Sequence, residues 1–221
     1  LGVPSRVSFT GRDRDLARLH LLLGRTDEIP SQLALVAGEP GIGKTRLLTQ
    51  FGREAHDSGA VVLYGRADEN GVVPYGPFVD ALRGAGLEAS ESIPEAMGAA
   101  DTNGSGVARL RYFDAVSELL GRLAGGARVV LALDDLHWAD ESSLLLLKHL
   151  ARDQRRSRLL LAMSFRDSEP PRADLGGAIA DLSRDVPAER LRLRALAGAD
   201  IALIADEAAA GELSAEAIDA V

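Results

Sequence analysis

The chain has 221 residues, of which 46% are hydrophobic, enough to fill the core of one large α/β domain and the beginning of a second. Its 25 basic and 33 acidic residues give a net charge of −8, which argues against direct nucleic-acid contact by this segment. It contains no cysteine, no signal peptide and no apolar run near the roughly 18 residues that span a bilayer, so we expect a cytoplasmic protein without membrane contact.

Apolar periodicity predicts helices that alternate with buried strands. A first helix is expected from Asp15 to Gly24, because Leu16, Leu19 and Leu23 recur at helical spacing. Unbroken apolar runs, typical of parallel strands covered on both faces, are expected to form strands over residues 33–37, 60–64, 129–133 and 159–165, with a short fifth strand over 190–193. Further helices are predicted after residue 45 and over 79–82, 107–123, 142–151 and 178–182.

Strands separated by helices predict an α/β fold with a parallel five-stranded sheet and right-handed crossovers. The carboxyl ends of its strands should then converge on one edge. We expect residues 1–195 to form this α/β domain and residues 196–221 to begin a small α-helical lid. Because the chain does not start with Met and its end lacks a capping signal, we expect it to be an excised piece.

A phosphate-binding loop follows the first buried strand. Residues 38–45 have the sequence Gly-Glu-Pro-Gly-Ile-Gly-Lys-Thr, with the spacing G-x-x-x-x-G-K-[ST]. Glycines let backbone N–H groups turn toward phosphate oxygens, Lys44 reaches the terminal phosphates, and Thr45 offers its hydroxyl to Mg²⁺. The alternative is a glycine-rich turn that only links strand and helix. We predict nucleotide binding by Glu39, Pro40, Gly41, Ile42, Gly43, Lys44, Thr45 and Arg46.

Two acids directly follow the strand over residues 129–133. Asp134 is expected to hold Mg²⁺ beside Thr45, and Asp135 is the candidate to orient or deprotonate the attacking water. The alternative is that the two acids only begin a loop. Because Asp is one methylene shorter than the Glu more usual in vigorous ATPases, we expect slow hydrolysis.

Two arginines are further candidates. Arg166 follows the strand over residues 159–165 and is predicted to sense the terminal phosphate, unless it forms a surface ion pair with Asp167 or Glu169. Arg184 could act in trans as an arginine finger on a neighbouring subunit, although an exposed loop arginine is usually only solvated.

The segment over residues 137–140 contains the only tryptophan. We interpret it as a turn in which Trp138 packs on the sheet edge and Asp140 or Ser142 caps the next helix, rather than as a catalytic segment. The four histidines show no metal-ligand spacing on any one element, so no zinc site is expected.

Five segments together resemble the ATPase module of STAND-type P-loop NTPases within the AAA+ group, in particular that of the large ATP-binding LuxR-type transcriptional regulators of actinobacteria. They are residues 9–13 (Phe-Thr-Gly-Arg-Asp), 38–45, 74–78 (Pro-Tyr-Gly-Pro-Phe), 133–140 (Leu-Asp-Asp-Leu-His-Trp-Ala-Asp) and 164–167 (Ser-Phe-Arg-Asp). The first and third separate this group from other P-loop proteins.

The resemblance implies an adenine pocket lined by Val7, Phe9, Gly11 and Arg12, and therefore ATP or ADP with Mg²⁺ as cofactors. It also implies a nucleotide-dependent switch, signalling to DNA-binding and sensor domains elsewhere in a full-length regulator, with a possible nucleotide-dependent homo-oligomer. Two alternatives stay open: a P-loop kinase or other dedicated phosphotransfer enzyme, and an oligomerisation scaffold that holds its nucleotide permanently. GTP is disfavoured because no Asn-Lys-x-Asp motif occurs.

Overall fold

A computed structural model describes residues 9–29, 31–69, 73–84, 106–153, 158–167 and 174–206. Within them, five parallel strands form one sheet in the order β2-β3-β4-β1-β5. The strands are β1 (Ser31–Ala37), β2 (Val61–Arg66), β3 (Val129–Asp134), β4 (Leu159–Phe165) and β5 (Ala188–Arg192). This architecture confirms the predicted α/β fold.

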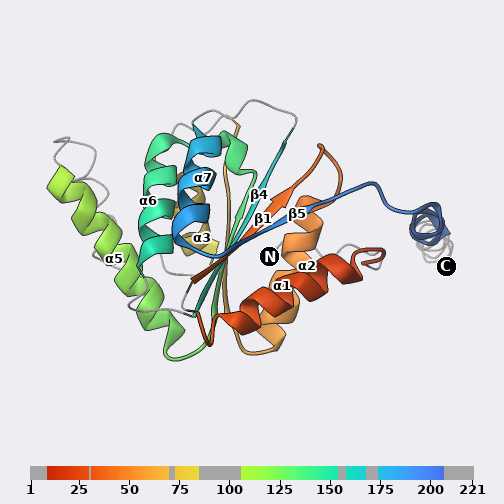
Figure 1. Ribbon diagram of the computed structural model, residues 1–221, viewed down its shortest axis with the longest axis horizontal. Helices are drawn as coiled ribbons and strands as arrows, with labels where there is room; N and C mark the ends of the chain where they lie inside the picture. The colour runs from red at the N-terminus through yellow and green to blue at the C-terminus, as the bar shows by residue number, and fades with distance from the viewer. Residues whose placement is uncertain are drawn as a thin grey trace, which may run out of the picture.

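Helices cover both faces of the sheet (Figure 1). On one face lie α1 (Asp13–Arg25) and α2 (Lys44–Asp57), and on the other lie α3 (Gly76–Gly84), α5 (Gly106–Ala124), α6 (Glu141–Arg152) and α7 (Leu175–Asp185). A hydrophobic core lies on each face of the sheet. Alternate residues of β1 point to opposite faces, so that Leu33 and Leu35 pack in the larger core and Ala34 and Val36 pack in the core beneath α1 and α2. Burial on both faces explains why the strand segments have unbroken apolar sequences.

The β2 edge of the sheet is covered by α3, and Gly65 makes this close packing possible. A Cβ atom at Gly65 would lie only 1.8 Å from the carbonyl oxygen of Pro77 and 2.8 Å from the amide nitrogen of Ala81. A glycine in a strand often marks such a close backbone approach. The packing brings the first turns of α3 next to the carboxyl end of β2, where the candidate site begins.

Several element boundaries differ from those expected from sequence. The helix predicted over residues 178–182 extends over Leu175–Asp185, because the side chain of Asp174 accepts a hydrogen bond from the N–H of Gly177 and caps a glycine-containing first turn. The fifth strand ends at Arg192 rather than at residue 193.

Residues 198–206 are helical, which agrees with the first helix expected in the lid segment. The second helix expected there lies outside the described residues. No helix in the described part of the chain has both the length and the apolar character needed to span a bilayer.

Candidate functional site

The loop over residues 38–45 connects β1 to α2 at the carboxyl edge of the sheet. Gly43 caps α2 with a left-handed φ of 101°, a conformation that favours glycine. The buried Lys44 ammonium donates to the carbonyl oxygens of Gly38 at 2.8 Å and Glu39 at 2.9 Å, so the lysine lies back over its own loop. Burial lowers the pKa of Lys44; the carboxylate of Asp135 opposes this shift, and the charge of Arg166 adds to it.

Asp134, at the end of β3, accepts hydrogen bonds from three hydroxyl groups contributed by three different elements. Thr45 Oγ1 donates to its Oδ2 at 2.6 Å, Tyr64 Oη donates to the same oxygen at 2.8 Å, and Ser164 Oγ donates to Oδ1. Asp134 is completely buried. Burial, together with the neighbouring Asp134 carboxylate, raises the pKa of the Tyr64 phenol, which therefore stays a donor.

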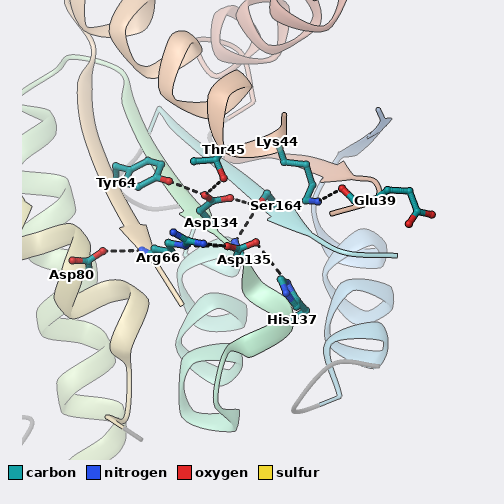
Figure 2. A network of polar contacts seen from close by, with 10 residues as sticks. All are labelled: Glu39, Lys44, Thr45, Tyr64, Arg66, Asp80, Asp134, Asp135, His137 and Ser164. Carbon is teal, nitrogen blue, oxygen red and sulfur yellow. Dashed lines mark hydrogen bonds and ion pairs between the residues drawn. The ribbon is translucent and has the colours of Figure 1, made fainter. Parts of the chain in front are cut away.

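Asp135 has a left-handed backbone with φ 56°, unusual for a residue with a side chain. Its N–H donates to Ser164 Oγ at 3.0 Å. Arg66, at the end of β2, reaches Asp135 Oδ2 with Nε at 2.9 Å and with Nη2 at 2.7 Å (Figure 2). This hydrogen bonding raises the pKa of the Arg66 guanidinium. The carboxylate proposed from sequence as a base is therefore held by a cation in this conformation.

The surroundings of Asp135 are shown in Figure 2, where Arg66 lies between Asp80 of α3 and Asp135. The backbone N–H of Arg66 donates to Asp80 Oδ2 at 2.9 Å. On the other side, His137 Nδ1 lies 4.0 Å from Asp135 Oδ1. The position of Arg66 is thus coupled to α3 as well as to Asp135.

Thr45 and Asp134 together present oxygen atoms of the kind that Mg²⁺ prefers. Within the described residues, no three His, Asp or Glu side chains lie close enough to hold a metal ion by themselves. An ion beside Thr45 and Asp134 would have to complete its coordination with phosphate and water oxygens, as Mg²⁺ commonly does. The donor set therefore fits this cofactor.

The residues expected to line an adenine pocket have several roles in the structure. The Arg46 guanidinium lies over the Phe9 ring, 5.9 Å from its centroid. Buried Arg12 donates through Nη2 to the carbonyl oxygens of Ile42, at 3.0 Å, and Arg194, at 2.8 Å, which connects the 38–45 loop to the segment after β5. A Cβ at Gly11 would lie 2.7 Å from Asp200 Cγ. Val7 lies outside the described residues.

The two candidate arginines differ in their surroundings. Arg166, half-buried directly after β4, is close enough to Lys44 to lower its pKa, whereas neighbouring Asp167 pairs with Arg192 Nε at 3.0 Å. Arg184 has a side chain that is 73% exposed and donates to Asp181 of its own helix. A role of Arg184 in trans on a neighbouring subunit stays a prediction.

The 137–140 segment forms the expected turn. Residues Leu136–Trp138 form a short 3₁₀ helix, η1, and half-buried Trp138 packs against the core. The Asp140 side chain accepts from the N–H of Ser143 at 2.9 Å and caps α6, which confirms Asp140 rather than Ser142 as the cap.

Sequence reasoning missed Tyr64, Arg66 and Ser164. A signal existed for Ser164, since it is the polar residue within an otherwise apolar, fully buried strand, and such a position needs a hydrogen-bond partner. No local sequence pattern distinguishes Arg66 from the exposed arginines. Arg66 lies beside Asp135 because it is the partner of Asp134 in the register of β2 against β3, which depends on the fold.

Residues 8–163 match the model of the AAA ATPase domain family. The chain belongs to this family. The AAA ATPase domain implies nucleotide binding, in agreement with the 38–45 loop. Among curated proteins, no sequence matches the chain significantly.

Several solved structures are similar to this chain at low sequence identity. A chain of Drosophila ORC bound to DNA has 15% identity and a TM-score of 0.50, with 84% of this chain and 95% of that chain covered. A variant of Thermotoga maritima RuvB has 16% identity and a TM-score of 0.49, with 90% and 51% covered. C. elegans PCH-2 has 15% identity and a TM-score of 0.48, and this chain spans 45% of its length. At these identities the similarity concerns the fold alone.

Proposed function

We propose that this AAA ATPase domain is a Mg²⁺-dependent switch that binds ATP or ADP and hydrolyses ATP slowly. The observation that carries the proposal is the arrangement at the ends of β2 and β3. Thr45 of the 38–45 loop contacts Asp134, while Asp135, the acid predicted from the sequence to activate water, is paired with Arg66. A site built for rapid turnover would leave its base available to the water.

In the proposed nucleotide complex, the backbone N–H groups of the 38–45 loop and Lys44 contact the phosphates. Lys44 exchanges its present carbonyl acceptors, Gly38 and Glu39, for phosphate oxygens. Thr45 and Asp134 would hold Mg²⁺, which when bound would supply positive charge against the phosphates. We assign to Arg166 the sensing of the terminal phosphate; the support is its position after β4, where its charge lowers the pKa of Lys44.

We further propose that the domain is the ATPase module of a cytoplasmic LuxR-type transcriptional regulator. The support is the resemblance of the segments over residues 9–13, 74–78 and 133–140 to the corresponding segments of that group. The connection from the 38–45 loop through Arg12 to Arg194 offers a path from nucleotide state to the lid, which we place after residue 195. Partner domains of the full-length regulator would respond to the lid, and the nucleotide state could also control a homo-oligomer.

Titration with labelled ATP and Mg²⁺ tests the site. Lys44→Ala should weaken ATP binding at least about tenfold, because it removes a charged hydrogen-bond donor to phosphate. Lys148→Ala is the matched control, since Lys148 lies on α6 and pairs with Asp181 at 2.8 Å. Undiminished binding by Lys44→Ala would refute the site.

Two other results test the rest of the proposal. Normal turnover of Asp135→Asn would refute the role of Asp135 as base. ADP that stays tightly bound to the purified protein, without exchange, would favour the permanent scaffold.

A further inference from the structure

The Asp134 carboxylate is held by hydroxyl groups from both neighbouring strands of the sheet. In the strand order β2-β3-β4, the strand that ends at Asp134 lies between the strands of Tyr64 and Ser164. Tyr64 Oη donates to Asp134 Oδ2 at 2.8 Å, and Ser164 Oγ donates to Asp134 Oδ1 (Figure 2). Each carboxylate oxygen is thus fixed from one side of β3, so the carboxylate cannot rotate without breaking one of these hydrogen bonds.

The direction of each hydrogen bond follows from the protons available. The N–H of Asp135 donates to Ser164 Oγ at 3.0 Å, so the Ser164 hydroxyl keeps its own proton for Asp134. Thr45 Oγ1 donates to Asp134 Oδ2 at 2.6 Å, which leaves the lone pairs of the Thr45 oxygen available to a cation. An ionised carboxylate has about four acceptor positions, and three hydroxyl groups occupy three of them here. Asp134 therefore has one acceptor position left for a cation, or for a water molecule bound to one.

A carboxylate fixed in this way distinguishes cations by their size. Mg²⁺ requires nearly octahedral coordination by oxygens at about 2.0–2.1 Å, whereas Ca²⁺ takes about 6–8 oxygens at about 2.3–2.6 Å in flexible geometry. The number and the flexibility of the ligands decide between the two ions. Ca²⁺ would require Asp134 to move or to offer a second oxygen, and the hydrogen bonds from Tyr64 and Ser164 oppose both changes.

We propose that Tyr64 is a positioning residue that makes the cation site at Thr45 and Asp134 selective for Mg²⁺ over Ca²⁺. The Tyr64 ring packs against the core beneath α1 and α2, and this packing keeps the hydroxyl on Asp134. The inference rests on the proposed nucleotide binding, because the phosphates complete the coordination of the ion. If the hydroxyl only compensated the burial of Asp134, its removal would lower stability without changing the preference between the two ions.

Tyr64→Phe tests the proposal, because it removes the hydroxyl and keeps the ring. Binding of a fluorescent ATP analogue to the purified chain is followed by anisotropy, first in EDTA and then in separate titrations with MgCl₂ and CaCl₂. The Mg²⁺ concentration that gives half of the change should rise at least about tenfold, as is usual when a group that orients a metal ligand is removed. The corresponding Ca²⁺ concentration should change less, and binding in EDTA should stay the same.

Tyr112→Phe is the matched control. It makes the same chemical change at a buried tyrosine of α5 whose hydroxyl has no hydrogen-bond partner in the described part of the chain. Both metal titrations of Tyr112→Phe should equal those of the unmodified chain. Ser164→Ala releases Asp134 Oδ1 instead of Oδ2, so it should also reduce the preference for Mg²⁺ and tests the same arrangement if Tyr64→Phe does not fold.

The outcomes separate this inference from the nucleotide site on which it rests. An unmodified chain that binds no ATP analogue with either metal would refute the proposed function, and the role of Tyr64 with it. Metal-dependent binding that Lys44→Ala abolishes and Tyr64→Phe leaves unchanged would overturn only the role of Tyr64. Equal losses for Mg²⁺ and Ca²⁺ in Tyr64→Phe would also overturn it, since they would show a structural contribution without selectivity.

Discussion

Replacing Arg66 with glutamine should accelerate ATP hydrolysis and destabilise the fold at the same time. In the structure, Nε and Nη2 of Arg66 both donate to Asp135 Oδ2, at 2.9 and 2.7 Å. Asp135 is 8% exposed in its side chain, so this cation is its main compensation for burial. Glutamine keeps the polarity and most of the length of the side chain but removes the charge.

The size of both effects follows from the exposure of the pair. Hydrogen bonds to charged groups contribute about 1.5–3 kcal/mol when buried, and exposed ion pairs at most about 1 kcal/mol. Because Arg66 is 59% exposed, we take about 1.5 kcal/mol for the whole contact. Releasing Asp135 from a contact of this size should raise turnover about tenfold. The same loss should lower Tm by about 3–6 °C in a domain of this length.

The assay is phosphate release at saturating MgATP, with a thermal melt of the same sample. Arg128→Gln is a matched control, because Arg128 also holds an aspartate, Asp27, through Nε at 3.1 Å and Nη2 at 2.5 Å, but lies before β3, at the opposite edge of the sheet from the site. Adding Asp135→Asn to Arg66→Gln should abolish the gain in rate. If Arg66→Gln alone slows hydrolysis, Arg66 supports turnover rather than restraining Asp135, and the reasoning is wrong.

Two further predictions concern packing and buried polarity. Gly65→Ala should destabilise the domain by about 3 kcal/mol or more in denaturant unfolding, because its Cβ would lie only 1.8 Å from the Pro77 carbonyl oxygen. The control Gly84→Ala, whose Cβ would lie 3.7 Å from its nearest neighbour, should be neutral or slightly stabilising. Equal behaviour of the two variants would contradict the close contact of α3 with β2. Tyr112→Phe should raise Tm by about 2–4 °C, because the fully buried hydroxyl has no hydrogen-bond partner in the described structure and its removal recovers about 1 kcal/mol. Tyr64→Phe, which loses the 2.8 Å hydrogen bond to Asp134, should lower Tm. A Tm that falls in Tyr112→Phe and rises in Tyr64→Phe would contradict this assignment of the hydrogen bonds.

Local sequence patterns were sufficient for the elements that form the centre of the sheet. The runs over residues 129–133 and 159–165 are apolar almost throughout because both faces of β3 and β4 are buried, and this made them recognisable as parallel strands. The edge strand β5 was placed less well, since charged residues interrupt its apolar pattern and three of its five residues, Ala188, Arg190 and Arg192, are exposed. The order of strands depends on long-range packing, and no local pattern encodes it.

The residues of the candidate site also fall into those that the sequence predicts and those that only the fold brings together. Lys44, Thr45 and Asp134 could be predicted because the spacing of the loop and the end of a buried strand carry their chemistry in the sequence. Arg66 and Tyr64 could not, because their contacts with Asp135 and Asp134 arise only from the register of β2 against β3. The structure also shows that Arg12 donates hydrogen bonds to the carbonyl oxygens of Ile42 and Arg194, contacts that the sequence motif does not predict.

The turnover number at saturating MgATP, without added effector, tests the central claim most directly. Lys44→Ala gives the background rate of the assay. Because Asp135 is held by Arg66 in this conformation, we expect turnover below about 1 per second, under the range of ordinary enzymes, together with saturable ATP binding. Turnover of tens per second or more would contradict the account, since it would require Asp135 to be available to water in most molecules.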